Sequence, residues 1–319
     1  MARRPQELPE VRFNNPRLAK VGVEAISAAD LWRRAGPAGR AFLAAPLRVD
    51  FHHLLLVRDG RGKHVVDFVE HDLAPGSVLL VRPGQVQQWR TFDKIQGQLA
   101  LISGEALAPS VGRSDVDMRL LNLAVWPAVS RPSSELFCEA LAGMERLSAD
   151  VARFKGTDVE AAIIRHELLT LLLRLARELR GTALHRLPGR EAEIHEQFAT
   201  ELELTYSKRP SALELAQRLG YSESTVSRAC LALTGRTAKQ AIDERIALEA
   251  KRLLVHSRAT AAQIGHQLGF SEPTNFAKFF KRMVGCAPLE FQRTHLSLDG
   301  PLASPRRKAD GGRRSRETR

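Results

Sequence analysis

Residues 212–235 read ALELAQRLGYSESTVSRACLALTG, and residues 261–285 read AAQIGHQLGFSEPTNFAKFFKRMVG. The two stretches follow one pattern, because LGYSE in the first returns 49 residues later as LGFSE in the second. One extra residue then enters the second copy, and Arg228 matches Lys278. Each copy predicts a helix, a turn at glycine and a second helix, as in a helix-turn-helix unit. Such a unit places its second helix in the major groove of DNA, so the repeat predicts two DNA readers.

Local chemistry predicts the turns and the helix caps of both units. Gly220 and Gly269 stand at the turns, where glycine takes a positive φ at no steric cost. Ser222 and Ser271 follow, and we expect each to cap the second helix with its side-chain oxygen. Pro273 falls in the first helical turn, where its missing N–H costs nothing. The residues expected to face inward are Leu213, Ala216, Leu219 and Val226 in the first unit, and Ile264, Leu268, Phe276, Phe279 and Phe280 in the second.

The outward positions of the second helices carry side chains suited to DNA. Arginine and lysine can donate to the edge of guanine, and Ser, Thr and Asn serve as smaller donors or acceptors to bases or phosphates. The base-reading candidates are Ser224, Ser227, Arg228, Thr274, Asn275 and Lys278. The phosphate-contacting candidates are Ser222, Lys239, Lys281 and Arg282. For the base-reading residues the alternative is a phosphate contact, and for Lys239, Lys281 and Arg282 it is a merely solvated charge.

The segment between the two units supplies an independent length. Residues 237–256 predict one continuous helix, which would span roughly 30 Å at about 1.5 Å per residue. Successive major grooves on one face of B-DNA repeat at roughly 34 Å. One chain could therefore reach two adjacent grooves of double-stranded DNA.

At this point residues 191–293 resemble the DNA-binding domain of the AraC/XylS transcription regulators. The similar stretches are IGHQLGFSEPTNFAKFFKRMVGCAPLEFQR at 264–293 and ERIALEAKRLL at 244–254. The resemblance implies an all-α domain over 191–296, with helix-turn-helix units at 211–233 and 261–284 and RNA polymerase as a partner. In the first unit Cys230 and Leu231 depart from the family pattern, which commonly has an aromatic and a basic residue there.

The region before this domain has the pattern of a β structure. Between residues 21 and 131, short apolar runs such as FHHLLLV at 51–57 alternate with Gly and Pro turns, which indicates a sandwich or barrel. The stretches LLLVRDGRGKHVVDF at 54–68 and LAPGSVLLVRPGQVQQW at 73–89 resemble the cupin-type sensor domain of the same family. The resemblance implies a small barrel that holds a small-molecule effector, at residues the sequence does not identify.

A metal-dependent cupin enzyme fused to a DNA-binding module is the alternative from another class. Metal cupins use clustered His and one Glu, but His52, His53, His64 and His71 form no HxH pair. Gln85, Gln87 and Gln88 stand where a second-motif His is usual, and neutral amides are poor ligands. We therefore expect no catalytic residue, no metal and no cofactor. Adjacent strand residues face opposite ways, so only one of His52 and His53 can line the interior, and the alternative is a satisfied barrel histidine or a surface one. A third reading is an architectural DNA binder of low specificity.

Two helices are predicted in residues 132–181, after the strands end. The second carries one apolar stripe, formed by Ile164, Leu168, Leu171, Leu172, Leu175 and Leu179. This stripe needs a cover, either the barrel or a partner chain, and we expect a homodimer. Residues 182–190 read as a linker, residues 1–20 as an extended N-terminal segment, and residues 297–319 as a disordered basic tail.

Composition sets the outer bounds of these predictions. The chain has 319 residues and a formal charge of +12, and residues 208–296 hold 14 Lys and Arg against 7 Asp and Glu. This excess suits an anionic partner. Cys138, Cys230 and Cys286 are far apart, and no run of about 18 apolar residues occurs, so we expect a cytoplasmic protein that does not cross a membrane. The predicted class is an α+β multidomain chain, with an N-terminal cupin-like β-barrel, a central helical pair and a C-terminal all-α double helix-turn-helix domain.

Overall fold

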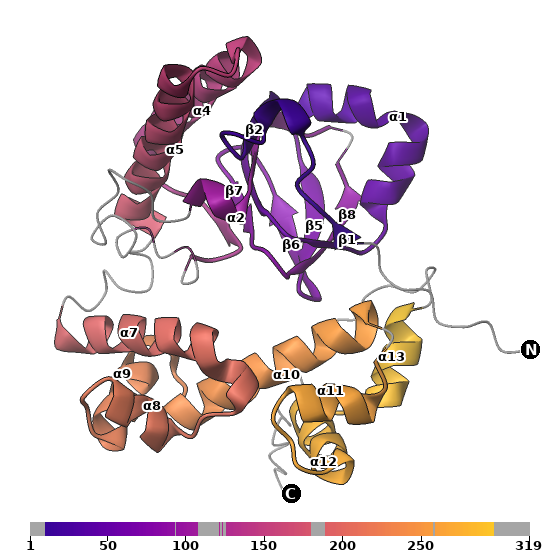
Figure 1. Cartoon of the computed structure of the whole chain (residues 1–319), viewed down its shortest axis with the longest axis vertical. Coiled ribbons are helices and arrows are strands. Elements are labelled where there is room, and N and C mark those ends of the chain that lie inside the picture. Colours follow the sequence, from indigo (N-terminus) through magenta and orange to yellow (C-terminus); the bar gives the residue numbers. More distant parts are fainter. Residues whose placement is uncertain are drawn as a thin grey trace, which may run out of the picture.

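The computed structural model describes residues 10–92, 94–107, 121, 123, 126–179, 189–257 and 259–296. The predicted tail at 297–319 and most of the predicted linker at 182–190 lie outside these residues. A sheet-rich half with a pair of long helices lies on one side, and an all-α half lies on the other (Figure 1). The predicted fold class is confirmed.

The strands form two five-stranded sheets, ordered β1-β3-β8-β5-β6 and β10-β7-β4-β9-β2. Neighbouring strands are antiparallel, apart from the parallel pair β1 and β3. The strands are β1 (Glu10–Val11), β2 (Val23–Ser27), β3 (Leu47–Val49), β4 (His52–Asp59), β5 (Gly62–Val66), β6 (Val69–Leu73), β7 (Val78–Val81), β8 (Val86–Thr91), β9 (Gln96–Ile102) and β10 (Val129–Ser130).

Alternating side chains on β4 divide the sheet-rich half into two cores. Leu55 and Val57 face the other sheet and join the core between the sheets. Leu54 and Leu56 face outward and pack against the long helices. Gly97 on β9 lets the central strands approach, because a Cβ there would lie 1.9 Å from the carbonyl oxygen of Leu56.

The two long helices, α4 (Ser134–Arg153) and α5 (Asp158–Leu179), cover the outer face of the sheet that contains β4. Every residue of the predicted apolar stripe on α5 is buried. The stripe packs against α4 and this sheet. The sequence left open whether the barrel or a partner chain covers this stripe. The sheet-rich half of the same chain covers it, so a dimer contact would have to use another face of the helices.

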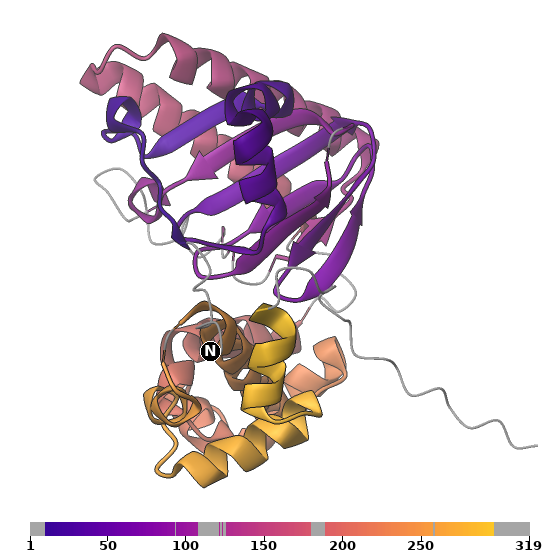
Figure 2. The same cartoon turned by 90° about the vertical axis from the view of Figure 1, so that its right-hand side faces the viewer.

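The long helix after β2 was not predicted. Residues 28–44 form α1 (Ala28–Ala44), which bends at Gly36 (φ 59°) just before Pro37. The sequence GPAG at 36–39 has the pattern of a turn, and here the turn is a kink within a helix. Trp32 anchors α1 to the core between the sheets, where its ring lies 5.3 Å from that of Trp89. Figure 2 shows α1 in front of the sheets and the helical pair behind them.

The segment before β2 is more structured than expected. Residues 10–20 contain β1 and a short 3₁₀ helix, η1 (Pro16–Leu18), and Leu18 is buried. These residues are therefore part of the domain rather than an extended segment, and residues 1–9 lie outside the described residues. A further short helix, α2 (Gly104–Leu107), follows β9.

The all-α half is built around one long helix. Its elements are α7 (Arg190–Thr205), η3 (Tyr206–Lys208), α8 (Ala212–Arg218), α9 (Glu223–Thr234), α10 (Ala238–His256), α11 (Ala261–Gln267), α12 (Pro273–Val284) and α13 (Pro288–Leu296). The predicted continuous helix is confirmed as α10, and the two helix-turn-helix units lie at its two ends (Figure 1). Ile242, Ile246 and Leu254 on α10 are buried in the core of this half. In the parts of the chain described above, no helix is long and apolar enough to cross a membrane.

Candidate nucleic-acid interface

The first unit consists of α8, a turn and α9. Ser211 and Glu214 form a capping box at the start of α8. Gly220 takes a φ of 74° at the turn, as predicted for glycine. The Oγ of Ser222 then accepts a hydrogen bond of 3.2 Å from the backbone N–H of Thr225, which confirms the predicted cap of α9. Val226, on the inner face of α9, is buried, also as predicted.

The inward face of α8 contains Leu215 in place of the predicted Leu213. Leu213 is 49% exposed, whereas Leu215 is fully buried beside Ala216. The cap at Ser211 fixes the start of the helix, and from there positions 212, 215 and 216 share the inner face. The prediction that Leu213 faces inward was therefore wrong, because this residue lies on the outer face of α8.

The second unit repeats this arrangement with α11 and α12. Gly269 takes a φ of 78° at the turn, and Pro273 is the first residue of α12, both as predicted. The predicted cap is wrong: the residue at the cap position is Glu272, and no side chain makes a capping bond. The extra residue of the second copy explains this, because it moves the helix start one position beyond Ser271.

A close helix–helix contact holds the second unit together. A Cβ added at Gly265 on α11 would lie 2.8 Å from the Cβ of Phe276 on α12, so the two backbones meet there. Phe276 and Phe280 are fully buried, and Phe279 is nearly so. Phe270, in the turn between the helices, adds a ring 5.4 Å from that of Phe276. The predicted aromatic core of this unit is confirmed.

The outer faces of α9 and α12 carry the predicted base-reading residues at the surface. Ser224, Arg228, Thr274, Asn275 and Lys278 are exposed, and Ser227 is half-buried. Among the residues that the structure describes, Arg228 and Lys278 make no hydrogen bond or ion pair through their side chains. Each of the two units therefore presents an unpaired cation at the matching helix position.

The phosphate candidates are less uniform. Lys239 is exposed at the start of α10, and Lys281 is exposed near the end of α12. Arg282 instead donates to Asp243 over 3.3 Å, and its guanidinium lies 5.6 Å from the centre of the Phe279 ring. The hydroxyl of Ser222 is engaged in the cap of α9. Of the four, Lys239 and Lys281 are thus the ones whose charges face solvent without a partner among the described residues.

Apart from the helix-turn-helix units, a cluster of polar side chains lies in the core between the two sheets. The side-chain oxygen of Gln87 on β8 accepts from Nδ1 of His53 and Nε2 of His64, both over 3.1 Å. Nε2 of His53 and Nδ1 of His64 are buried without a partner in the described residues. Trp89 lies beside them, its ring 4.2 Å from that of His64. His53, rather than the half-buried His52, is the histidine of the predicted adjacent pair that faces the interior.

Burial keeps these histidines neutral. It lowers the pKa of His53 to about 4, against the opposing effect of its hydrogen bond to Gln87. Burial also lowers the pKa of His64 well below its ordinary value, and the neighbouring His53 adds to this effect. Across the described chain, no three His, Cys, Asp or Glu side chains gather as a metal site requires. The amide of Gln87, which the sequence marked only as an unsuitable ligand, is the centre of this cluster.

Comparison with known proteins gives two domain matches. The helix-turn-helix domain family matches residues 215–294, and the AraC-like ligand binding domain family matches residues 33–114. The transcriptional activator RhaS of Pectobacterium carotovorum is 26% identical over 257 residues, which are 78% of this chain and 88% of RhaS. The uncharacterized regulator YisR of Bacillus subtilis is 28% identical over 123 residues, 39% of this chain and 41% of that protein. The structure of ToxT from Vibrio cholerae aligns with a TM-score of 0.40 at 11% identity, covering 86% of this chain and 98% of ToxT.

Fold and site together define a class: a ligand-binding, sheet-rich domain joined to a helical domain with two helix-turn-helix units. Such a chain is a DNA-binding regulator that an effector modulates. This chain belongs to the AraC/XylS family of transcription regulators.

Proposed function

We propose that one protomer reads two adjacent major grooves of a specific promoter site, with α9 in one groove and α12 in the next. The observation that supports this is the pair of unpaired cations, Arg228 and Lys278, on two units that one rigid helix separates. With 19 residues, α10 is about 28 Å long, close to the roughly 34 Å between successive grooves.

Each reading residue has a proposed role in this arrangement. Arg228 and Lys278 donate to guanine edges, while Ser224, Ser227, Thr274 and Asn275 make shorter-range base contacts. Lys239 and Lys281 contact phosphate, and Ser222 contributes by fixing the N-terminus of α9, where backbone N–H groups favour an anion. Arg282 takes the phosphate role only after giving up its bond to Asp243, so we rank it below the two lysines.

Substitution of the two cations tests base reading. Arg228→Ala or Lys278→Ala should each cost about 1–3 kcal/mol of specific binding and relax the choice of base at one position. Lys281→Ala should instead weaken binding to all sequences alike, with a shallower dependence on salt. The measurement is a genomic pull-down that yields the target site, followed by footprinting and titration at one stated salt concentration.

Random DNA is the control for this experiment. A low-specificity architectural binder would bind the target and a random competitor with similar affinity. Unchanged affinity and base preference in both Arg228→Ala and Lys278→Ala would reject the assignment of these residues as readers.

The sheet-rich half is proposed to hold the effector in its interior, near His53, His64 and Gln87. Buried ring nitrogens without partners support this, because buried polar atoms are normally bonded. We infer that this half performs no catalysis and needs no cofactor. The rival metal-dependent enzyme would show stoichiometric iron, manganese or zinc in the purified protein. RhaS is named a transcriptional activator, and we propose that this chain likewise activates, with RNA polymerase as its partner.

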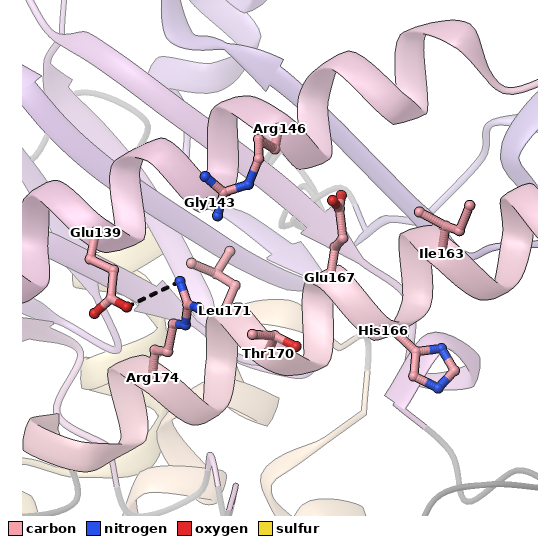
Figure 3. A pocket seen from close by; sticks show the side chains of 9 residues that line it. All are labelled: Glu139, Gly143, Arg146, Ile163, His166, Glu167, Thr170, Leu171 and Arg174. Carbon is pink, nitrogen blue, oxygen red and sulfur yellow. Dashed lines mark ion pairs between the residues drawn. The ribbon is translucent and has the colours of Figure 1, made fainter.

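We further propose a homodimer through the outer side of α4 and α5. Figure 3 shows a groove between these helices, lined by side chains of both charge signs, in which Arg174 pairs with Glu139 over 3.1 Å. Ile163, which lines this groove, and Val159, four residues before it on α5, leave 47% and 71% of their surface exposed. Paired charges around exposed apolar groups suit a second copy of the chain.

A charge introduced into this face should separate the protomers. Ile163→Arg is expected to raise the dimer dissociation constant by about tenfold or more, because the interface would bury an unpaired cation. Sedimentation across a range of concentrations measures this constant. The matched control is Ala162→Arg, one position away on α5 and exposed, but not among the groove residues. Equal dissociation constants for the Ile163→Arg variant and the unsubstituted chain would exclude this face.

A further inference from the structure

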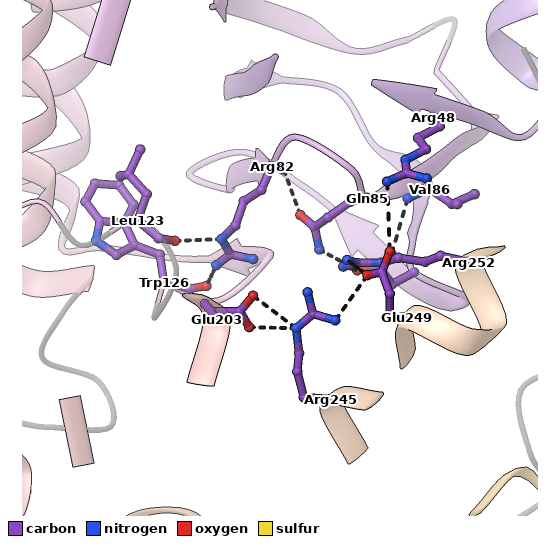
Figure 4. Close-up of polar contacts among 11 residues, drawn as sticks. Arg48, Arg82, Gln85, Val86, Leu123, Trp126, Glu203, Arg245, Glu249 and Arg252 are labelled. Carbon is purple, nitrogen blue, oxygen red and sulfur yellow. Dashed lines mark hydrogen bonds and ion pairs between the residues drawn. The ribbon is translucent and has the colours of Figure 1, made fainter. Parts of the chain in front are cut away.

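A buried ion pair joins the sheet-rich half to the long helix of the DNA-binding half. Arg252 on α10 donates from Nε to Oδ1 of Asp67 over 2.8 Å, and from Nη2 to Oδ2 over 2.6 Å. The two side chains are only 8% and 9% exposed. Asp67 lies in the turn between β5 and β6, 185 residues away in the sequence. Figure 4 shows Arg252 and Glu249 of α10 next to Gln85 and Arg48 of the sheet-rich half.

The turn that carries Asp67 has an unusual backbone. Asp67 and Phe68 have φ values of 48° and 70°, in the left-handed region that favours glycine. Such backbone strain persists only where the surrounding structure holds it in place. Here Phe68 packs against Phe291 of α13, with ring centres 5.5 Å apart, and the amine of Lys251 lies 5.1 Å from its ring centre. The turn thus touches both α10 and α13.

The charges in this contact are fully engaged. Asp67 also accepts from the side chain of Gln85 over 2.5 Å and from the backbone of Val86 over 3.2 Å. Arg252 also donates to Glu249 over 3.1 Å. Burial raises the pKa of Asp67, but the bonds and the charge of Arg252 outweigh it and hold that pKa below its ordinary value. Arg252→Gln would leave Asp67 buried without this counter-charge, which is strongly destabilising, whereas Asp67→Asn would leave Arg252 with Glu249 alone.

The start of β8 connects this contact to the interior of the sheet-rich half. Gln85 and Val86 bond Asp67, and Val86 packs in the core of the DNA-binding half. The next residue, Gln87, faces the other way and bonds His53 and His64. Three consecutive residues therefore contact the proposed effector site on one side and the ion pair on the other.

We propose that the Asp67–Phe68 turn is a latch that holds α10 against the sheet-rich half, and that residues 85–87 carry a change inside that half to the latch. This deepens the proposed function and rests on it, since the latch would be the route from effector to DNA reader. An effector that moves Gln87 shifts the population between latched and released states.

Hydrogen exchange of the full chain, without DNA, tests the latch. Arg252→Gln and Asp67→Asn should each speed backbone exchange in both the 67–69 turn and α10 by about 100-fold or more. The double variant should be no faster than the faster single variant, because both changes remove the same pair. The matched control is Arg218→Gln, which breaks a 3.0 Å ion pair to Glu201 inside the DNA-binding half and touches no residue of the latch. That control should leave the turn protected. Additive effects, or an unchanged turn in Arg252→Gln, would overturn the latch.

The connection through β8 is tested in the same assay. Gln87→Leu and His64→Phe each remove one side of the interior cluster, and either should speed exchange of the 67–69 turn. In the Asp67→Asn background the same substitutions should add nothing there. The coupling would be rejected if these substitutions sped exchange of the turn equally with and without Asp67→Asn. It would also be rejected if neither substitution sped exchange. Because no DNA is present, these outcomes are independent of whether Arg228 and Lys278 read bases.

Discussion

Replacing Phe276 by alanine is expected to abolish specific DNA binding, although every side chain proposed to touch DNA would remain. Phe276 is fully buried in the second unit, between the rings of Phe270 and Phe280 at 5.4 and 5.9 Å. Truncating a buried phenylalanine costs about 3–5 kcal/mol, which is a large share of the stability of a typical domain. The loss falls on the contact that orients α12.

The helix–helix contact makes this site hard to repair. The backbone of α11 already meets the Cβ of Phe276 at Gly265, so α12 cannot move closer at that point to fill the space left by the ring. Denaturant unfolding and DNA titration of the full chain measure the two effects. Lys278→Ala is the control, because it removes an exposed side chain of the same helix and should leave stability unchanged. Target binding by Phe276→Ala at full affinity would mean that the second unit is not needed for reading.

The sequence predicted the DNA-binding half well because its signals are local. Glycine at a turn, serine at a cap and apolar residues at helical spacing each act within a few positions, and they appear twice. Gly220, Ser222 and Phe280 all have the predicted environments. The errors there are also local: one extra residue moved the cap past Ser271, and the helix start at Ser211 turned Leu213 outward.

Longer-range features escaped prediction for a different reason. The GPAG motif at 36–39 is compatible with a turn or with a kinked helix, and the packing of Trp32 on Trp89 decides between them. The interior role of Gln87 depends on His53 and His64, which come from two other strands. Neither choice can be made from neighbouring residues alone.

One pattern in the sequence could have indicated the latch. Arg245, Glu249 and Arg252 recur at helical spacing on the long helix, so they form a charged stripe on one face. A charged stripe on a helix is ordinarily exposed, but here Glu249 and Arg252 are buried. Their partner Asp67 lies in a turn whose sequence, VDFV at 66–69, has no glycine to announce a left-handed backbone. Only the tertiary structure brings the two together.

Acid is expected to destabilise the sheet-rich half well before its carboxylates titrate. Burial lowers the pKa of His53 to about 4, and burial together with the charge of Arg82 lowers that of His52 to about 4 as well. Burial also lowers the pKa of His64 well below its ordinary value. An unfolded histidine titrates near 6.5, so the unfolded chain binds more protons than the folded chain below that pH.

The sign and the pH range follow from these values. The contribution of each neutral histidine to stability is fully present above about pH 6.5 and is lost as the pH falls toward the folded pKa. Between pH 6.5 and about 4, each such residue should add about 1.4 kcal/mol per pH unit to the loss. Asp67 acts only at lower pH, because its folded pKa is depressed from an already low carboxyl value. Asp67 therefore adds little to the slope between pH 7 and 5.

Urea unfolding at pH 7, 6 and 5 would measure the effect, with the tryptophan fluorescence of the sheet-rich half as the signal. His71, His195 and His295 also have a pKa lowered by burial, so the slope of the unsubstituted chain includes them. The informative quantity is the difference between chains. His64→Phe should make the pH dependence shallower by about 1.4 kcal/mol per pH unit, since one proton fewer is taken up on unfolding. If His64→Phe had the same slope as the unsubstituted chain, His64 could not be a buried neutral histidine, and the interior cluster around Gln87 would be wrong as described.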